Sequence, residues 1–330
     1  MIVVGAGIIG LSCAWRLARQ GHEVRVFDAQ QAAREASWAG AGMLAPGGEL
    51  DRASPVADLC LRSLRAWPEF AAALEQEAGA PIDFRRSGAI EVAFDEAEAG
   101  ILNEKAAAQA ELGIRSEPAT HLGWPARFYP DDAVVDPRDV TAALLTACRR
   151  RGVRLHEHEP VLAVAPDGKS VFTAQGEYSD TGVLIAAGAW SSGLLPGLPR
   201  TIPVRGHLIS WTLAPGVLEP ILRHGHTYLL QRRSGVLIAG ASMERVGYDR
   251  ALDEAAVERI RKNAARLLPA LGALPPDDRW IGFRPGIEGE VPAIGQIAGT
   301  AIWTAFGHFR NGILMAPETA LRIASMPGQA

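Results

Sequence analysis

Near its start the chain reads Gly5-Ala6-Gly7-Ile8-Ile9-Gly10, a G-x-G-x-x-G sequence within 330 residues. It follows the β-branched run Ile2–Val4 and opens the segment Ile8–Arg19, in which apolar residues recur at helical spacing. Glu23–Phe27 is the next expected strand. Strand, tight turn, helix and strand form the βαβ opening of a dinucleotide-binding fold, because the glycines let the backbone approach a pyrophosphate at the helix N-terminus.

An acidic residue, Asp28, stands at the end of the second expected strand, eighteen residues past Gly10. A carboxylate at this place can accept hydrogen bonds from the adenosine ribose hydroxyls, and it repels the 2′-phosphate of NADP. The turn and the acid together predict a bound dinucleotide. They do not distinguish NAD from FAD, so both cofactors stay open at this point.

Composition limits the other possibilities. A length of 330 residues with 48% hydrophobic content is enough for two cores. The 33 basic and 37 acidic residues are scattered and give a net charge of −4, which argues against nucleic acid as a partner. The three cysteines have no C-x-x-C pairing, so we expect no disulfide framework and no metal site. With no apolar run approaching the ~20 residues of a membrane span, a soluble, cytoplasmic protein is expected.

The remaining pattern alternates helices and strands. The Ala-, Gly- and Ser-rich segment 30–51 is expected to be an extended loop that approaches a ligand closely. The run 183–188 has the apolar character of a strand buried in a parallel sheet, whereas 204–241 reads as longer, antiparallel strands. Helices are expected at 55–77, 96–112, 137–151, 254–268 and 312–325, and further strands at 89–94, 153–156, 207–212, 228–231, 236–239 and 302–306.

Three longer segments resemble one known family. Residues 35–46 (EASWAGAGMLAP) resemble the flavin-contacting loop of the D-amino acid oxidase superfamily, in particular its glycine oxidase branch, which is linked to thiamine biosynthesis. Residues 307–317 (GHFRNGILMAP) are similar to the segment that wraps the pyrimidine side of the flavin, and Gly282–Pro285 to the carboxylate-binding segment. The chain departs from the family pattern at Glu288-Gly289-Glu290, where relatives carry Asp-Gly before the proline.

This resemblance implies a fold class and a division of the chain. We expect an α/β protein with a Rossmann-like FAD-binding domain around a parallel sheet and an antiparallel-sheet α+β substrate domain, similar to D-amino acid oxidase. The FAD-binding domain is expected to be discontinuous, formed by residues 1–50, 136–200 and 281–330. Residues 51–135 and 201–280 then form the substrate-binding domain.

The resemblance also implies non-covalent FAD, since no cysteine lies near the 284 or 310 segments. At the C-terminal segment, amides at a helix start are expected to face flavin C2=O, which requires Pro317 to lie in the first turn of that helix. His308 is interpreted as a packing or hydrogen-bonding residue. The cofactor-binding residues expected from the turn and the resemblance are Gly5, Ala6, Gly7, Ile8, Ile9, Gly10, Asp28, Ala36, Ser37, Gly40, Ala41, Gly42, Met43, Val161, Gly188, Trp190, His308, Asn311, Gly312, Ile313 and Leu314.

For the substrate, the resemblance places a carboxylate-binding guanidinium at Arg284, at a strand end facing a cleft. Tyr228 and Met243 are expected to line the pocket, with Arg310 near its mouth or in a structural ion pair. The implied reaction is oxidative deamination of glycine, or of a small amine or D-amino acid, by hydride transfer to flavin N5, with dioxygen reduced to peroxide. The imine product is a candidate precursor for thiazole synthesis, and relatives suggest a homotetramer.

The sequence is compatible with three alternative functions. An FAD-dependent D-amino acid or proline dehydrogenase would pass its electrons to a quinone. An NAD-dependent dehydrogenase could use the same βαβ turn. A non-catalytic flavin-binding protein would hold FAD without reducing it.

Overall fold

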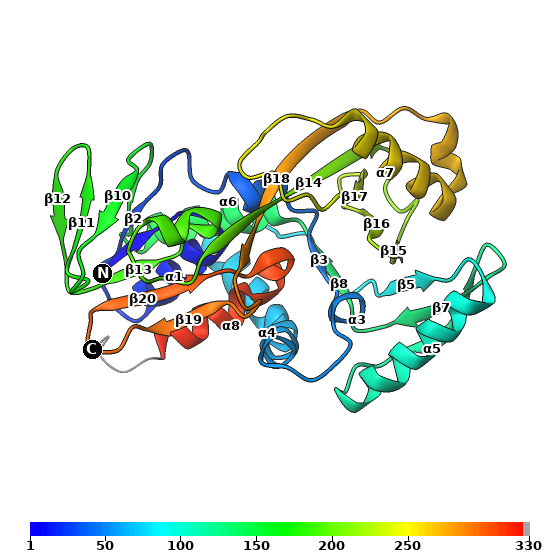
Figure 1. Ribbon diagram of the computed structural model, residues 1–330, viewed down its shortest axis with the longest axis horizontal. Coiled ribbons are helices and arrows are strands. Elements are labelled where there is room, and N and C mark those ends of the chain that lie inside the picture. Colours follow the sequence, from blue (N-terminus) through cyan, green and yellow to red (C-terminus); the bar gives the residue numbers. More distant parts are fainter. Residues whose placement is uncertain (326–330) are drawn as a thin grey trace.

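The computed structural model describes residues 1–325 and contains a central six-stranded sheet (Figure 1). Its strand order is β19 (Ala293–Gln296), β20 (Ile302–Phe306), β13 (Val183–Ile185), β1 (Ile2–Val4), β2 (Arg25–Phe27) and β9 (Arg154–His156). All neighbouring strands run parallel except β19 and β20. The parallel pairing of β13 with β1 and β20 confirms the buried strand expected at 183–188.

The two faces of this sheet have different covers because successive side chains of a strand point to opposite sides. Val3 packs into the core cluster that also holds Trp15 and Trp67, on the side of helices α1 (Ile8–Arg19), α4 (Pro55–Ala78), α6 (Pro137–Arg150) and α8 (Gly312–Ala324). Ile2 and Val4 pack into a second cluster with Val164 and Val171. Those two come from a three-stranded sheet, β10 (Val161–Val164), β11 (Ser170–Thr173) and β12 (Glu177–Ser179), so the parallel sheet is buried on both faces.

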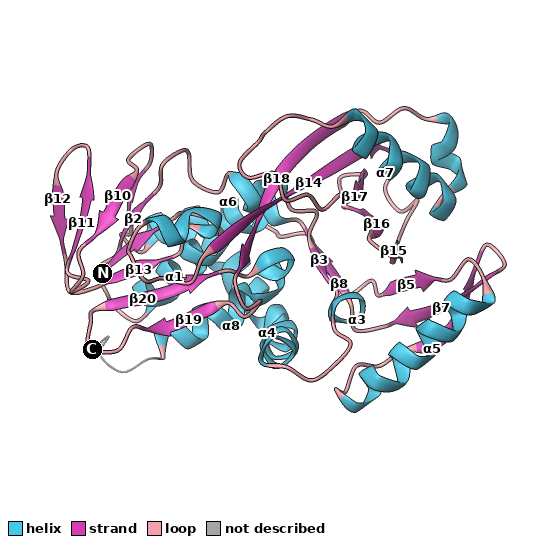
Figure 2. Ribbon diagram, viewed as in Figure 1, coloured by secondary structure: helices cyan, strands magenta, loops and turns pink. Residues whose placement is uncertain are grey.

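An eight-stranded sheet lies beside the first (Figure 2). Its order is β18 (Asp278–Ile287), β14 (Thr201–Thr212), β17 (Val236–Gly240), β16 (Thr227–Gln231), β15 (Ile221–His224), β5 (Ala89–Val92), β7 (Trp124–Tyr129) and β6 (Glu117–His121). All pairs are antiparallel except β15 with β5, which confirms the antiparallel character expected for 204–241. Helix α7 (Glu254–Leu267) packs on β14, β16 and β17, and α5 (Glu96–Glu111) packs on β7.

The expectation for the segment before α4 is wrong. Segment 30–51 is not an extended loop: it forms two short helices, α2 (Glu35–Ala39) and α3 (Pro46–Glu49), separated by β3 (Met43–Leu44). Strand β3 pairs with β8 (Ala133–Val135), which also pairs with β4 (Phe84–Arg85). Contacts from distant parts of the chain stabilise these short elements, as when Trp280 Nε1 donates to the Ala39 carbonyl at 3.0 Å.

Short 3₁₀ helices occupy Gly188–Gly193 (η1), Pro269–Ala273 (η2) and Phe309–Asn311 (η3). Within residues 1–325 no helix has the length and apolar character needed to cross a membrane. We propose that the chain divides into the two expected domains at residues 50, 135, 200 and 280; helix α4 packs on α6 and α8 across this division, and residue 280 lies within β18. Limited proteolysis, with the fragments identified by mass, tests this division.

Candidate active site

A cavity of about 870 Å³ lies at the carboxyl ends of β1, β2, β13 and β20, where they meet β14 and β18 of the larger sheet. In parallel α/β sheets, ligands bind at this end of the strands. Most of the residues expected at the site line this one cavity. They are Gly5, Gly7, Ile8, Ile9, Asp28, Ala36, Ser37, Gly40, Ala41, Gly42, Met43, Val161, Gly188, Trp190, Tyr228, Met243, Arg284, His308, Arg310, Asn311, Gly312 and Ile313.

Three expected cofactor residues do not line the cavity. The Ala6 N–H donates to Asp28 Oδ2 at 2.7 Å, so it holds the acid in place. Gly10 packs against the turn: a Cβ there would lie 1.9 Å from the Gly5 carbonyl oxygen. The Leu314 carbonyl accepts a hydrogen bond from Trp67 Nε1 at 3.0 Å. All three therefore support the wall of the cavity from behind.

The turn before α1 needs glycine for steric reasons. Gly5 has φ +106°, a value that side chains rarely tolerate, and a Cβ there would lie 2.5 Å from the Ala186 carbonyl oxygen. Helix α1 starts at Ile8, and its N-cap, Gly7, has no side chain that could cap it. The Ser37 Oγ of α2 accepts from the Ile8 N–H at 2.8 Å. Ser37 thus occupies the first amide of α1, and the next amide, at Ile9, has no side-chain cap and lines the cavity, where it can bind an anion.

Asp28 lies where β2 ends, and both of its oxygens are held by backbone amides. Oδ2 accepts from Ala6 and Oδ1 accepts from the Gln30 N–H at 2.9 Å. Burial raises the pKa of Asp28, and these two hydrogen bonds act in the opposite direction. The carboxylate keeps further lone pairs for a ligand hydroxyl in the cavity.

Helix α8 opens toward the same cavity. Its N-cap, Asn311, makes no side-chain capping bond, and Gly312 and Ile313 line the wall. The expected position of Pro317 is wrong: it is the sixth residue of α8 and lies beyond the first turn. Pro317 has no N–H to donate within α8. Helix α4 contacts the backbone on both sides of it: Trp67 Nε1 donates to the Leu314 carbonyl oxygen at 3.0 Å, and Ser63 Oγ accepts from the Glu318 N–H at 3.1 Å.

His308 precedes this helix and is bonded away from the cavity. Its Nε2 lies 3.0 Å from Thr319 Oγ1, and its ring is buried. Burial lowers the pKa of His308 to about 3, so the ring is neutral near pH 7. This geometry agrees with a packing and hydrogen-bonding residue.

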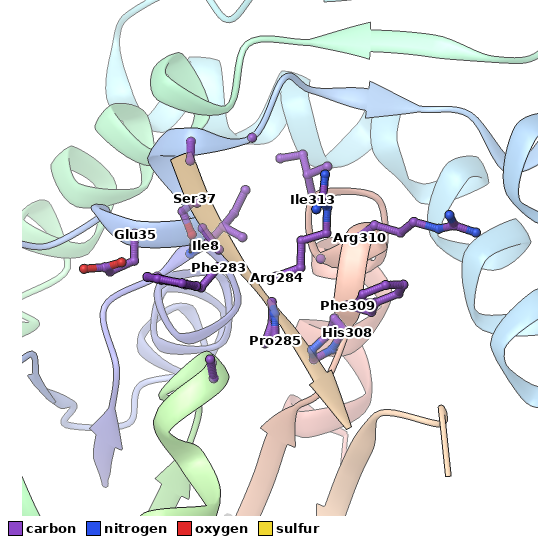
Figure 3. A pocket seen from close by; sticks show the side chains of 18 of the residues that line it. Ile8, Glu35, Ser37, Phe283, Arg284, Pro285, His308, Phe309, Arg310 and Ile313 are labelled. Atoms are coloured by element: carbon purple, nitrogen blue, oxygen red, sulfur yellow. Dashed lines mark hydrogen bonds between the residues drawn. The ribbon is translucent and has the colours of Figure 1, made fainter. Parts of the chain in front are cut away.

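The same cavity also presents a guanidinium. Arg284 lies within β18, and Figure 3 shows its side chain on the same side of that strand as Arg310 and Ile313, with Phe283 on the other side. The expected strand end is therefore wrong, because β18 continues to Ile287. Among residues 1–325 no carboxylate forms an ion pair with Arg284; its Nη1 donates only to the Ser242 carbonyl oxygen, at 3.0 Å.

Glycines make room for the side chains around this guanidinium. A Cβ at Gly206 would lie 2.2 Å from Arg284 Nη1, and one at Gly240 would lie 2.7 Å from the Tyr228 hydroxyl oxygen. Tyr228 pairs with Gly240 across β16 and β17. Burial raises the pKa of Tyr228 to about 12, so its hydroxyl keeps its proton. Arg284 and Tyr228 together offer hydrogen-bond donors to an anion.

Arg310 contributes a second cation on the cavity wall. Its Nε forms an ion pair with Glu49 Oε2 at the end of α3. Glu49 was not among the expected residues, although it lines the cavity and is largely buried. Met243 also lines the cavity and is 48% exposed, so its side chain lies at the opening.

Sequence reasoning also missed Gly206, Gly240 and Ser242. A glycine in a strand is a signal for a close approach, which points to Gly206 and Gly240 once the strands are known. Ser242 and Glu49 carry no such signal, because their roles depend on contacts across the fold.

The cavity suits a dinucleotide with a flavin. Two open helix N-termini, of α1 and α8, reach its wall, and these helices pack against each other. The first can hold a pyrophosphate, and the second can stabilise negative charge on a reduced ring. Gly42, at φ +108°, brings its backbone within reach of the same space, and a Cβ there would lie 1.8 Å from the Val135 carbonyl oxygen.

Comparisons with known proteins agree with this geometry. The family model described as DAO, FAD dependent oxidoreductase, matches residues 1–326. The chain is 33% identical to the bifunctional protein ThiO/ThiG of Synechocystis sp., over 99% of this chain and 51% of that protein. It is 32% identical to the glycine oxidase of Bacillus licheniformis, over 98% of this chain and 92% of that protein. The crystal structure of glycine oxidase from Geobacillus kaustophilus matches with a TM-score of 0.92 at 28% identity, covering 98% and 92% of the two chains.

Proposed function

The chain belongs to the family of FAD-dependent oxidoreductases, and we propose that it oxidises glycine or a similarly small amine that carries a carboxylate. The observation that carries this proposal is Arg284, a guanidinium at the cavity wall without a carboxylate partner among residues 1–325. A partly desolvated charge of this kind costs free energy unless a ligand pairs with it. A carboxylate matches the parallel N–H donors of a guanidinium.

We assign binding and orientation to the side chains around Arg284. Arg284 and the Tyr228 hydroxyl bind the substrate carboxylate, and Ser242 fixes one nitrogen of the guanidinium. FAD, when bound, supplies the acceptor for the hydride that leaves the α-carbon. The open helix N-terminus at Asn311–Ile313 stabilises negative charge in the cofactor's part of the cavity. The overall reaction converts glycine, dioxygen and water to glyoxylate, ammonia and hydrogen peroxide.

We also propose which residues bind each part of FAD. We propose that Gly5, Gly7, Ile8, Ile9 and Asp28 hold the pyrophosphate and ribose, with Ala6 and Gly10 supporting the turn and Val161 beside the adenine. Ala36, Ser37, Gly40–Met43 and Asn311–Ile313, with Gly188, Trp190 and His308, then surround the flavin, and Leu314 supports this wall from behind.

Several finer properties belong to this proposal. The relative named ThiO/ThiG supports a role of the imine product in thiazole synthesis, and growth of a ThiO-deficient, thiamine-requiring strain carrying this gene tests it. The free, buried cysteines fit a reducing cytoplasm. We also propose a homotetramer, which light scattering on the purified holoenzyme tests.

The test is an anaerobic flavin-bleaching screen with glycine, sarcosine, D-alanine and D-proline. Glycine is expected to bleach the flavin, and peroxide is expected to form on admission of air. Bleaching with dye reduction but without peroxide indicates a dehydrogenase instead. No bleaching by any amine overturns the proposal.

A pair of variants tests the assignment of Arg284. Truncating one partner of a buried charge pair costs ~2–5 kcal/mol, so Arg284→Ala is expected to lower kcat/KM at least ~30-fold while FAD stays bound. The matched control is Arg279→Ala, on the same strand but exposed and paired with Glu254. Equal kcat/KM for the two variants removes Arg284 from the carboxylate site.

A further inference from the structure

His207 is a buried side chain of β14 with two partners in one loop. Its backbone N–H donates to Ser242 Oγ at 3.0 Å, and its Nδ1 lies 2.8 Å from the same oxygen. On the other side of the ring, the Asp253 N–H donates to Nε2 at 2.9 Å. Ser242 and Asp253 are the two ends of the segment that connects β17 to α7, so one imidazole joins both ends.

The donors around the ring fix its tautomer. A backbone N–H can only donate, so Nε2 accepts and carries no hydrogen. In a neutral imidazole the hydrogen then lies on Nδ1, which donates to Ser242 Oγ. Desolvation lowers the pKa of His207, and Arg205 acts in the same direction. Glu244, whose Oε1 lies 3.6 Å from Nδ1, together with Asp253 and the Ala251 backbone, acts in the opposite direction. The neutral ring is therefore a fixed donor to Ser242.

Ser242 connects this ring to the substrate end of the cavity. Its hydroxyl oxygen accepts from His207, and its carbonyl oxygen accepts from Arg284 Nη1 at 3.0 Å. The two strands are adjacent, with Val204 opposite Arg284 and His207 opposite Ile281. Ser242 thus connects His207 of β14 to Arg284 of β18. Within residues 1–325, its carbonyl oxygen is the one acceptor that the Arg284 guanidinium has.

We propose that His207 is a positioning residue: through Ser242 it fixes the orientation of the Arg284 guanidinium that binds the substrate carboxylate. This inference rests on the proposed function of Arg284. A guanidinium recognises a carboxylate by two parallel hydrogen bonds, so its plane must be held to a narrow range of angles. The Ser242 peptide sets that plane only if its own side chain is fixed.

A separate anchor keeps the loop in place when His207 is changed. The Arg205 and Glu244 backbones exchange two hydrogen bonds of 2.9 Å, and the Arg205 guanidinium pairs with Glu244 and Asp249. A substitution at His207 is therefore expected to disturb the orientation of Ser242 without releasing the loop.

Two near-isosteric variants separate the two contacts of the ring. In His207→Asn, the amide nitrogen can take the place of Nδ1 and donate to Ser242, but the Asp253 contact is lost. In His207→Gln, an oxygen can take the place of Nε2 and accept from Asp253, but the donor to Ser242 is lost. The measurements are the calorimetric Kd of acetate for the holoenzyme, KM and kcat for the amine substrate, and Tm.

His207→Gln is expected to weaken acetate binding and raise KM about tenfold, the effect of one lost hydrogen bond, with kcat changed less. His207→Asn is expected to recover most of this loss. Ser242→Ala is expected to match His207→Gln, and the double variant to add nothing further. His121→Asn, on the far edge of the sheet, is the control.

The opposite results are clear. The positioning role is overturned if His207→Gln binds acetate as tightly as the unaltered protein. It is also overturned if acetate affinity falls in proportion to Tm, and equally, in the Asn and Gln variants. If the unaltered holoenzyme does not bind acetate, the carboxylate role of Arg284 fails instead. The two failures are therefore distinguishable.

Discussion

The indole nitrogen of Trp67, on α4, donates a hydrogen bond to the carbonyl oxygen of Leu314, on α8, at 3.0 Å. Three residues later Pro317 interrupts the backbone hydrogen bonds of α8, and Ser63 of α4 accepts from the next amide, Glu318. Helix α4 thus provides a donor and an acceptor around the proline. The start of α8, which faces the cavity, depends on these two contacts.

Trp67→Phe is expected to lower the free energy of unfolding by ~1–3 kcal/mol, because a buried carbonyl loses its partner. Urea unfolding of the holoenzyme measures the change. Trp124→Phe is the control, since Trp124 is 43% exposed, and a change within ~0.5 kcal/mol is expected there. Equal losses in both variants contradict the role given to the indole N–H.

Much of the fold could be predicted because the chain's local patterns agree with it. The bounds expected for α1, Ile8–Arg19, are those observed, and the α/β class and the resemblance to glycine oxidases are confirmed. The structure differs from the expectation at segment 30–51 and at Pro317 for the same physical reason. In both places tertiary hydrogen bonds, from Trp280 and from Ser63 and Trp67, outweigh a poor local preference for helix.

The site shows the same limit. Arg284 and Tyr228 could be named from the family resemblance, whereas Glu49, Ser242 and His207 could not. Their roles arise from side chains that meet only after folding, such as Glu49 with Arg310 and His207 with Ser242. No spacing along the chain encodes these pairs.

Gly10→Ala is expected to abolish FAD retention. The added Cβ would lie 1.9 Å from the Gly5 carbonyl oxygen, and this is a backbone atom that cannot move without opening the turn. Flavin absorbance per polypeptide after gel filtration measures the loss. The matched control is Gly100→Ala, within α5, where a Cβ meets nothing within 4 Å.

The control is expected to retain FAD and to gain up to ~1 kcal/mol of stability, because alanine favours a helix over glycine. Full flavin occupancy in Gly10→Ala contradicts the close packing of the turn.

Asp28→Ala is expected to weaken FAD binding by one to two orders of magnitude. It removes the acceptor for a ribose hydroxyl and frees the Ala6 and Gln30 amides from the carboxylate that holds them. Asp28→Asn keeps one oxygen acceptor, and its Kd for FAD is expected to lie between those of the unaltered protein and of Asp28→Ala. Fluorescence titration of the apoprotein with FAD gives Kd, and identical values for all three proteins refute the ribose contact.

Glu49→Gln is expected to change ligand preference in the cavity. Without the Glu49 charge, the Arg310 guanidinium has no counterion there and is free to pair with a second carboxylate. Binding of malonate relative to acetate is expected to rise on the order of tenfold, as one added charge interaction allows. The control is Glu288→Gln, which is exposed. An unchanged malonate-to-acetate ratio in Glu49→Gln excludes this role of the pair.

The buried imidazole of His308 makes stability depend on pH. Its pKa is about 3 in the folded protein, because of burial, and ~6.5 when the chain is unfolded. The unfolded state therefore binds more protons between these values, and stability falls as pH falls below ~6.5 and levels near 3. At 1.36 kcal/mol for each pKa unit, His308 is expected to cost about 2 kcal/mol at pH 5.

His308→Gln isolates this contribution from that of other titrating groups. Glutamine can still donate to Thr319, the partner of Nε2, but it does not titrate. The free energy of unfolding is measured with urea for both proteins at roughly pH 7.5 and 6.5, at and above the upper edge of the window, and at roughly pH 5.5 and 5.0, within it. The free energy of unfolding is expected to fall less steeply in the variant, so that the difference between the two proteins shifts by about 2 kcal/mol from pH 7.5 to pH 5.0. Parallel pH profiles would show that His308 binds a proton as readily in the folded protein as in the unfolded one.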